Sequence, residues 1–202
     1  MTDSFDGWGV ATKIESPLHV HAFGMIAMNA AMMEEVLTLM LSHFLQLPYD
    51  ISVSLIHKIA VRNRSDLIRQ IASERADEVG DLLDHINFAL DCFDRCLENR
   101  NILLHSVYVT VDNATQTMTV SKRVNKNPAK EFKMNLALTA LRKTAEEVAN
   151  TVSYLMDVWF VLRHGPGSNT LLRKPPLPSS LSPPQPPKVP KTSRSRPRSS
   201  RG

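Results

Sequence analysis

The sequence predicts an all-α bundle of about five helices, with a small β-hairpin after the fourth helix and a disordered C-terminal tail. Apolar residues recur at steps of three and four over long stretches, and hydrophobic residues make up 43% of the 202 positions. The helical spacing changes to strand-like alternation near Val107. We therefore expect one helical domain over residues 17–164, between a flexible arm at 1–16 and the tail at 165–202.

The first helix is expected to begin at Ser16-Pro17 and to end at about Gln46. Proline is favoured at the first helical position because its missing N–H would have no helical partner there. Leu47-Pro48 should end the helix, since a proline disfavours helical backbone at the residue before it. The apolar face comprises Phe23, Ile26, Ala27, Ala30, Met33, Leu37, Met40, Leu41 and Phe44.

Two shorter helices are expected next, one from Asp50 to about Ala60 and one around Leu67–Ala72. Four arginines surround the second of these helices, namely Arg62, Arg64, Arg69 and Arg75. Acidic residues nearby favour a solvated helix face, and the alternative is a rim of arginines that contact phosphate groups. A fourth helix should then run from Asp77 or Glu78 to about His105.

Strand-like alternation follows the fourth helix. Val107, Val109 and Val111 alternate with polar residues, Asp112-Asn113 is a turn signal, and the chain returns through Met118–Val120. A hairpin of this size is marginal by itself and needs helices to pack against.

The C-terminal third begins with a polar, basic connector expected over Lys122–Lys133. A last helix should run from about Asn135 to Arg163, before Gly165-Pro166-Gly167 ends it. Ten of the 13 prolines occur from Pro166 onward, together with eight Lys or Arg residues and no acid. This composition has too few apolar residues for a core, so we expect disorder. The remaining chain has 16 basic and 20 acidic residues, so the pI of about 9.2 reflects the tail.

Several classes of protein are disfavoured by what the sequence lacks. No stretch reaches the ~20 apolar residues of a membrane-spanning helix, and Met1–Gly9 carries two aspartates and no cation, unlike a secretory signal. Cys92 and Cys96 form no CxxC pair and are expected to be thiols in a reducing cytoplasm. His19 and His21 point to different sides of a helix, which disfavours zinc. We expect a cytoplasmic protein with no metal and no cofactor.

The most informative stretch is Leu97–Tyr108, at the end of the fourth helix. Its apolar stripe follows steps of three and four, and the members of this stripe are Ile86, Leu90, Phe93, Leu97, position 100 and Leu104. Position 100 is Arg, which must extend to solvent, pair with a carboxylate, or face a cleft or a partner. Asn101 and His105 are four apart and share another helix face. A structural interpretation remains open, in which Asp94, Glu98 or a carboxylate from another helix pairs with Arg100 and His105 caps the helix.

Arg100-Asn101 followed by His105, at the end of a long helix with a β-rich segment and a further helix after it, resembles the HEPN superfamily. The resemblance covers about residues 17–164 and is to the compact prokaryotic members with an Arg-Asn-x-x-x-His core. It implies a helical bundle that dimerises. Many such proteins are metal-independent endoribonucleases that act as toxins or defence effectors, and others are interaction or nucleotide-binding modules.

The chemistry of RNA cleavage fits these residues without the resemblance. Metal-free cleavage requires that the 2′-OH lose a proton, that the phosphate charge be neutralised and that the leaving oxygen gain a proton. His105 could act as base or acid, Arg100 suits the phosphate, and Asn101 could orient His105 or contact the phosphate. Because one chain supplies one obvious histidine, a homodimer would provide both acid and base.

We therefore expect an endoribonuclease that acts on RNA as a homodimer, with Arg100 and His105 catalytic, Asn101 supporting them, and an antitoxin or other protein as a further partner. Two alternatives remain open. One is a non-catalytic helical interaction or nucleotide-binding module in which Arg100 and His105 are structural or bind a nucleotide. The other is an RNA-binding accessory protein that works mainly through its basic tail.

Overall fold

The computed structural model describes residues 16–112, 114–124, 127–165 and 171–181, and it is mainly helical, as the sequence predicts. The elements in chain order are α1 (Pro17–Leu45), α2 (Tyr49–Ile56), α3 (Val61–Glu74), α4 (Ala76–Val79), α5 (Leu82–Leu104), β1 (Val107–Asp112), β2 (Thr117–Val124), β3 (Asn127–Ala137) and α6 (Leu138–His164). Apart from Ser16, the expected N-terminal arm at 1–16 lies outside the described residues.

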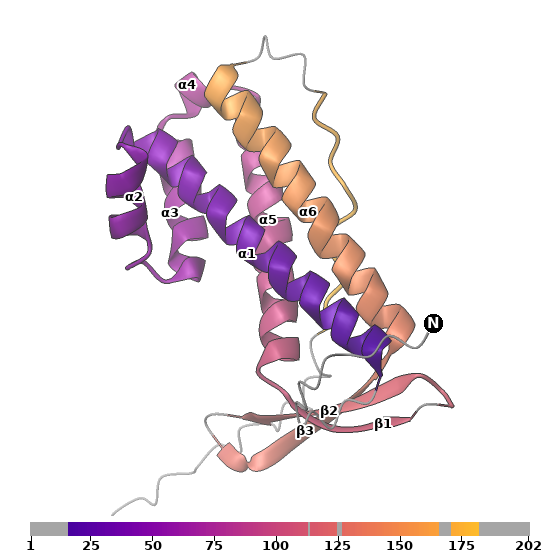
Figure 1. Cartoon of the computed structure of the whole chain (residues 1–202). Helices are drawn as coiled ribbons and strands as arrows, with labels where there is room; N and C mark the ends of the chain where they lie inside the picture. Colours follow the sequence, from indigo (N-terminus) through magenta and orange to yellow (C-terminus); the bar gives the residue numbers. More distant parts are fainter. Residues whose placement is uncertain (1–15, 113, 125–126, 166–170, 182–202) are drawn as a thin grey trace, which may run out of the picture.

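The three long helices form the body of the protein. α1 and α6 lie side by side and run in the same direction, while α5 lies behind them and runs the opposite way (Figure 1). α3 packs against both α1 and α5, and α2 packs against α1. The strands cross the end of the bundle at which α5 ends and α6 begins (Figure 1). This arrangement places the junction between α5 and β1 at the sheet end of the molecule.

Local sequence signals explain most of the helix ends. α1 begins after Ser16 with proline in its first turn, as predicted, and ends at Gln46, whose φ of 53° is left-handed. The predicted fourth helix is divided into α4 and α5, which corrects the expected start at Asp77 or Glu78. Gly80 lies between them with a φ of +58°, a backbone conformation that a residue with a side chain rarely adopts and that ends α4.

The core consists of two hydrophobic clusters stacked along the bundle. The main cluster includes Leu37, Phe93 and Leu155, and the second cluster, next to the sheet, includes Phe23 and Leu103. On two helices a polar residue separates the members of the two clusters along the sequence, and these residues are Asn29 of α1 and Arg100 of α5.

The strands form an antiparallel sheet with the order β1-β2-β3. The predicted hairpin is present, with Tyr108 opposite Val120 and Asp112 opposite Thr117. The expected polar connector is wrong, because those residues instead complete β2 and form β3, and α6 begins at Leu138 rather than Asn135. Phe132, Met134 and Leu136 alternate with polar residues, a strand signal that the surrounding lysines obscure. Met134 and Leu136 pack against the second cluster.

Residues 171–181 pack against the helical body, which differs from the disorder expected for the whole of 165–202. Leu172 contacts the main cluster, Leu181 contacts the second cluster, and Pro178 is buried. We call residues 171–181 the strap. Residues 166–170 and 182–202 lie outside the described residues, so the expectation for them stays a prediction.

By length and composition alone, α1 is apolar enough to cross a membrane. Half of its most apolar window is buried inside the protein, where α1 forms the core with α5 and α6. The core helix of a soluble protein passes the same test, so this finding is weak evidence for a membrane span.

Candidate functional site at the end of α5

Arg100 occupies the position on the apolar stripe of α5 that the sequence predicts. Leu97, one turn earlier, is 8% exposed and belongs to the main cluster, whereas Leu103 is fully buried in the second cluster. Arg100 is half-buried between them. A guanidinium at this position is partly removed from water, so its contacts decide whether its charge is compensated within the protein.

Among the residues that the structure describes, no carboxylate pairs with Arg100. One terminal nitrogen donates a hydrogen bond to Oδ1 of Asn101 at 3.0 Å, and Nε is buried without a hydrogen-bond partner among the described residues. None of the ion pairs between described residues involves Arg100. Asp94, one of the carboxylates that the alternative structural interpretation pairs with Arg100, instead accepts hydrogen bonds from Ser65 and Arg69. An arginine in this state has unused capacity for an anion.

His105 is exposed and is the first residue beyond α5. Its backbone N–H bonds to the carbonyl of Asn101 at 3.3 Å, and its ring makes no hydrogen bond to another described residue. Of the two roles predicted for Asn101, the orienting contact with His105 is not seen: no hydrogen bond joins the Asn101 carboxamide to the His105 ring, and the carboxamide oxygen accepts from Arg100. The structure joins Arg100 to Asn101 and leaves the His105 imidazole open to solvent.

A buried asparagine on α1 also lacks a partner for its side chain. Asn29 is 7% exposed, and its Nδ2 has no hydrogen-bond partner among the described residues. An unpartnered buried polar group costs about 1–3 kcal/mol, so a natural protein that retains one needs a reason. The sequence prediction does not include the burial of Asn29, although an Asn among Ile26, Ala30 and Met33 visibly interrupts an apolar face.

Sequence analysis also missed the burial of Arg64. Arg64 is only 4% exposed, on the face of α3 that also buries Ser65, Ile68 and Ala72. Its Nε donates to the carbonyl of Ile59 at 3.0 Å. The spacing of Arg64, Ile68 and Ala72 was the available signal, because an Arg at steps of four from two apolar residues lies on the inner face.

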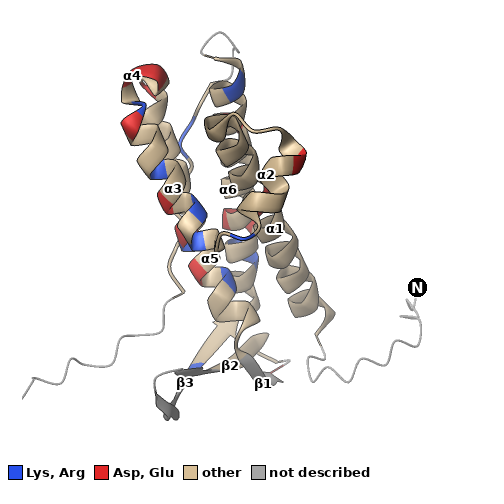
Figure 2. Cartoon of the chain, turned by 90° about the vertical axis from the view of Figure 1, so that its left-hand side faces the viewer, with Lys and Arg blue, Asp and Glu red and all other residues tan. Residues whose placement is uncertain are grey.

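Arg69 differs from its neighbours on the same helix. It pairs with Asp91 and Asp94 of α5, both at 2.9 Å, and donates to the carbonyl of Asn87. The expected solvated face balanced by local acids is therefore incorrect for Arg64 and Arg69. Basic and acidic residues are interspersed along α3 and the adjoining part of α5 (Figure 2).

Asn99, next to Arg100 in the sequence, holds the strap. Its Nδ2 donates to the carbonyl of Ser179 at 2.7 Å, and its Oδ1 accepts from the N–H of Leu181 at 2.9 Å. Ser179 also donates to Glu147 and accepts from Lys143, both on α6. The strap is thereby fixed through its main chain to the helix turn that carries Arg100.

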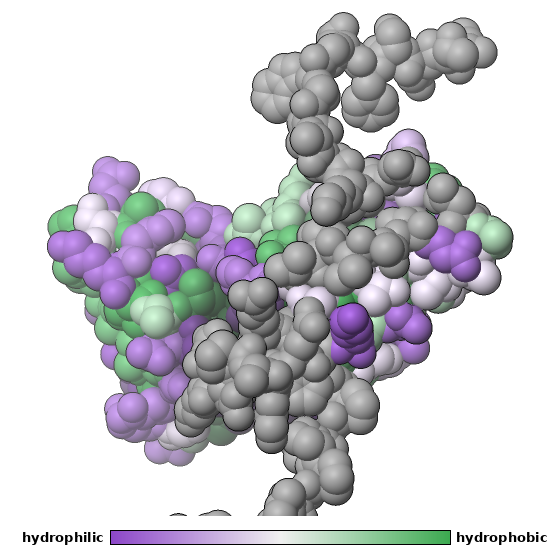
Figure 3. Space-filling view, turned by 90° about the horizontal axis from the view of Figure 1, so that it is seen from below, coloured by the Kyte–Doolittle hydropathy of each residue, from purple (hydrophilic) through white to green (hydrophobic). Residues whose placement is uncertain are grey.

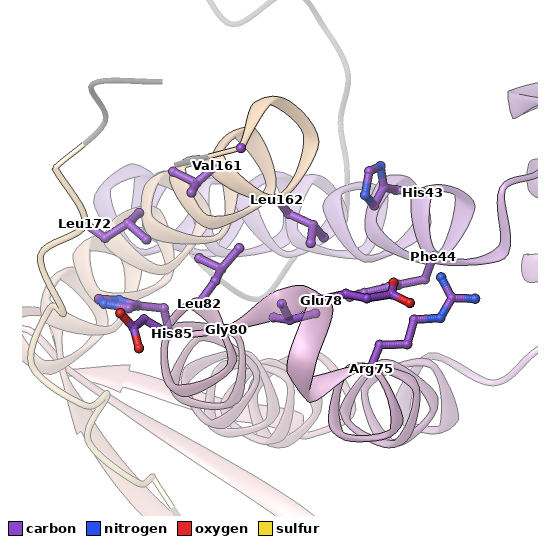
Figure 4. Close-up of a pocket in the computed structure, with 13 residues that line it drawn as sticks. His43, Phe44, Arg75, Glu78, Gly80, Leu82, His85, Val161, Leu162 and Leu172 are labelled. Carbon is purple, nitrogen blue, oxygen red and sulfur yellow. The ribbon is translucent and has the colours of Figure 1, made fainter. Parts of the chain in front are cut away.

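A pocket of about 630 Å³ lies at the opposite end of the bundle from the sheet (Figure 4). Its walls include Phe44, Leu82 and Leu162, and His43 and Arg75 lie at its polar side. Burial, and then the positive charges of Arg163 and Arg75, lower the pKa of His43. The sequence-predicted residues Arg100, Asn101 and His105 do not line this pocket.

The thiols are structural. Burial raises the pKa of Cys92 to about 11 and that of Cys96 to about 12, so neither is a thiolate nucleophile near neutral pH. Within the described residues, no group of three or more His, Cys, Asp or Glu side chains is placed to hold a metal ion. The chemistry that the described site offers is that of a guanidinium, a carboxamide and an imidazole.

Seen from the sheet end, hydrophilic and apolar side chains are mixed over the surface beside the strands (Figure 3). The fold and the candidate site define the class of protein as a mainly helical bundle with a polar site where a helix meets a strand. Comparisons of the chain with protein-family models, with curated proteins and with solved structures gave no match.

Proposed function

We propose that this protein is a HEPN-type endoribonuclease that cleaves RNA without a metal ion and acts as a homodimer. One observation carries the proposal. Arg100 lies on an apolar helix stripe, has no carboxylate partner among the described residues, keeps a buried Nε unpartnered, and is followed one turn later by an exposed imidazole. A structural arginine is expected to be paired, and a phosphate-binding arginine is expected to be available.

In this proposal Arg100 binds the scissile phosphate and stabilises the charge that builds up on its oxygens. Asn101 fixes the guanidinium through the 3.0 Å hydrogen bond, a positioning role that differs from the expected contact with His105. His105 takes the proton of the ribose 2′-OH. The 2′ oxygen then attacks phosphorus, the bond to the 5′ oxygen breaks, and the leaving oxygen receives a proton.

A second copy of the chain supplies the second imidazole. Two His105 side chains can then serve as base and acid, and two Arg100 side chains can share the phosphate charge. α1 provides a surface suited to such pairing, because positions 17–33 contain no Asp, Glu, Lys or Arg. Val20, Met28 and Met32 on this stretch are 48%, 54% and 49% exposed. An uncharged apolar stripe of this kind can face its own copy without burying unpaired charge.

The same proposal assigns the protein to the cytoplasm, as a toxin or defence effector that an antitoxin or other protein partner restrains. The HEPN resemblance of Arg100-Asn101 and His105 supports this setting, as does the mainly helical fold with strands directly after α5. The basic tail would add affinity for RNA that does not depend on sequence.

Cleavage of a single-stranded RNA by the purified protein tests the proposal. His105→Ala and Arg100→Ala should each lower the rate by about 10²-fold or more, the range expected for loss of an acid–base group or a charge-stabilising donor. His43→Ala is the matched control, since His43 is also exposed but lies at the other end of the bundle. Equal rates for the His105→Ala variant and the unmodified protein would refute the proposal.

A second function is favoured by a different observation. The Arg100 guanidinium contacts Asn101 and not His105, and the strap is fastened beside it at Asn99. These contacts also suit a non-catalytic module that binds a nucleotide or a protein partner. This alternative predicts no RNA cleavage by any variant, together with a lower melting temperature for Arg100→Ala.

A further inference from the structure

The pocket at the end of the bundle away from the sheet has a wall of partly exposed leucines. Leu82 of α5, Leu162 of α6 and Leu172 of the strap line the pocket, and each also packs against the main cluster. The volume of about 630 Å³ lies within the range of roughly 300–1,000 Å³ that is usual for small-molecule sites. Because covering apolar surface is favourable, the apolar part of a ligand would gain free energy by packing against this wall.

Basic side chains from three helices meet at one end of this pocket. His43 of α1 and Arg75, at the junction of α3 and α4, lie together there (Figure 4). Arg163 of α6, whose guanidinium lies 5.4 Å from the centre of the Trp159 ring, is close enough for its charge to act on His43. Burial lowers the pKa of His43, and the positive charges of Arg163 and Arg75 lower it further. An anion bound beside these three groups would relieve their mutual repulsion.

Arg75 is the cation best placed to bind such an anion. It is half-buried, it lines the pocket, and none of the ion pairs between described residues includes it. Glu78 lies near Arg75 in the pocket (Figure 4), but it is exposed, and no ion pair joins these two described residues. Arg69, earlier on α3, differs because two carboxylates neutralise it. The guanidinium of Arg75 can therefore donate two hydrogen bonds to one carboxylate of a ligand.

The acidic residues of the pocket limit the charge that a ligand can carry. Glu78 and Asp81 both line the pocket, and both are exposed. These two carboxylates would repel a ligand with several negative charges, such as a nucleoside triphosphate. A ligand with one negative charge can place that charge at Arg75 and leave both carboxylates in contact with solvent. The pocket therefore suits a singly charged carboxylate with an apolar body.

We propose that this pocket binds a small organic carboxylate, whose charged group contacts Arg75 and whose apolar body packs against the wall of leucines. Arg100, Asn101 and His105 do not line the pocket, so this site is separate from the candidate ribonuclease site and does not depend on the proposed function. Because Leu172 belongs to the strap, the bound carboxylate also holds that end of the strap against the helices.

Fluorescence of 8-anilinonaphthalene-1-sulfonate, which has an aromatic body and one negative charge, measures binding to the full chain. Decanoate should displace the dye, whereas decanol, which has the same length and no charge, should compete about 10-fold more weakly. Arg75→Gln should weaken decanoate binding by about 10-fold or more, the range expected for the loss of hydrogen bonds between charged groups. Arg62→Gln is the matched control and should not change the affinity, since Arg62 is an exposed arginine of α3 that does not line the pocket.

Equal competition by decanoate and decanol, or unchanged decanoate affinity in Arg75→Gln, would overturn the proposal. If Arg75→Gln does not fold, the comparison of decanoate with decanol on the unmodified protein still decides the outcome. Decanoate should also slow trypsin cleavage after Arg173, the exposed residue next to Leu172. Unchanged cleavage at a saturating concentration of decanoate would place the carboxylate elsewhere and overturn the assignment to this pocket.

Discussion

Two parts of α5 hold arginines in opposite ways. In the middle of the helix, Asp91 and Asp94 neutralise Arg69 of α3. At the end of the helix, Arg100 contacts a carboxamide, and within the described part of the chain it has no carboxylate partner and no partner for its buried Nε. The first arrangement joins two helices and contributes to stability. The second leaves binding capacity unused, which is what a site for an anion requires and a structural contact does not.

The largest expected effect on stability concerns Arg69, whose charge two carboxylates of α5 neutralise. Arg69→Met removes contacts to two carboxylates and to the Asn87 carbonyl. We expect a loss of about 2 kcal/mol in the free energy of unfolding, because hydrogen bonds to charged groups are worth about 1.5–3 kcal/mol and partial exposure reduces this. Urea unfolding measures it. A loss below about 0.5 kcal/mol would show that the pairing of Arg69 with Asp91 and Asp94 does not stabilise the fold.

Asn99 extends the comparison. It directly precedes Arg100 in the sequence, and both the nitrogen and the oxygen of its side-chain amide are hydrogen-bonded. Asn99→Ala removes two hydrogen bonds to the main chain of the strap. We expect a loss of about 1–2 kcal/mol in the free energy of unfolding and faster tryptic cleavage after Arg173. Asn150→Ala, at an exposed asparagine of α6, is the control and should change neither. Unaltered proteolysis in Asn99→Ala would mean that the other contacts of the strap, polar or apolar, hold it in place.

A smaller effect is expected from pH. Burial lowers the pKa of His19 below its usual value of about 6.5, so the unfolded chain binds a proton more readily than the folded one. Stability should therefore be retained above pH 6.5 and fall as the pH decreases below it. Melting temperatures between pH 7.5 and 5.5 measure this, and His19→Gln should weaken the dependence. An equal dependence in that variant would assign it to other groups.

The smallest effect concerns the thiols. The raised pKa values of Cys92 and Cys96, about 11 and 12, result from burial. Iodoacetamide at pH 8 should modify neither thiol in the folded protein and both in urea, as mass spectrometry can show. Rapid modification of the folded protein would indicate that this part of α5 opens readily.

The sequence predicts much of this fold because most helices carry their own signals. Ser16-Pro17 marks the start of α1, and the stripe that contains Leu97 and Leu104 identifies Arg100 as out of place. β3 is obscured by the lysines around Phe132, and the break before α5 depends on the left-handed backbone of Gly80. Both differences from the predicted fold, β3 and the break before α5, depend on residues that are close together in the sequence.

The remaining differences are long-range. The strap has no periodicity to read, and its position depends on Asn99, 80 residues before Ser179. The pairing of Arg69 likewise depends on α5, which the sequence places only through its own apolar face. Sequence alone identifies unusual residues, whereas the neighbours of a residue across helices decide whether its charge is compensated.

The most direct test of this account measures RNA cleavage and stability together in Arg100→Met and Arg69→Met. For Arg100→Met the account predicts a cleavage rate lower by about 10²-fold or more, with a free energy of unfolding that is unchanged or higher, because a buried group without a partner is removed. For Arg69→Met it predicts the reverse, with lower stability and unchanged cleavage per folded molecule. Lost stability and retained cleavage in Arg100→Met would contradict the account.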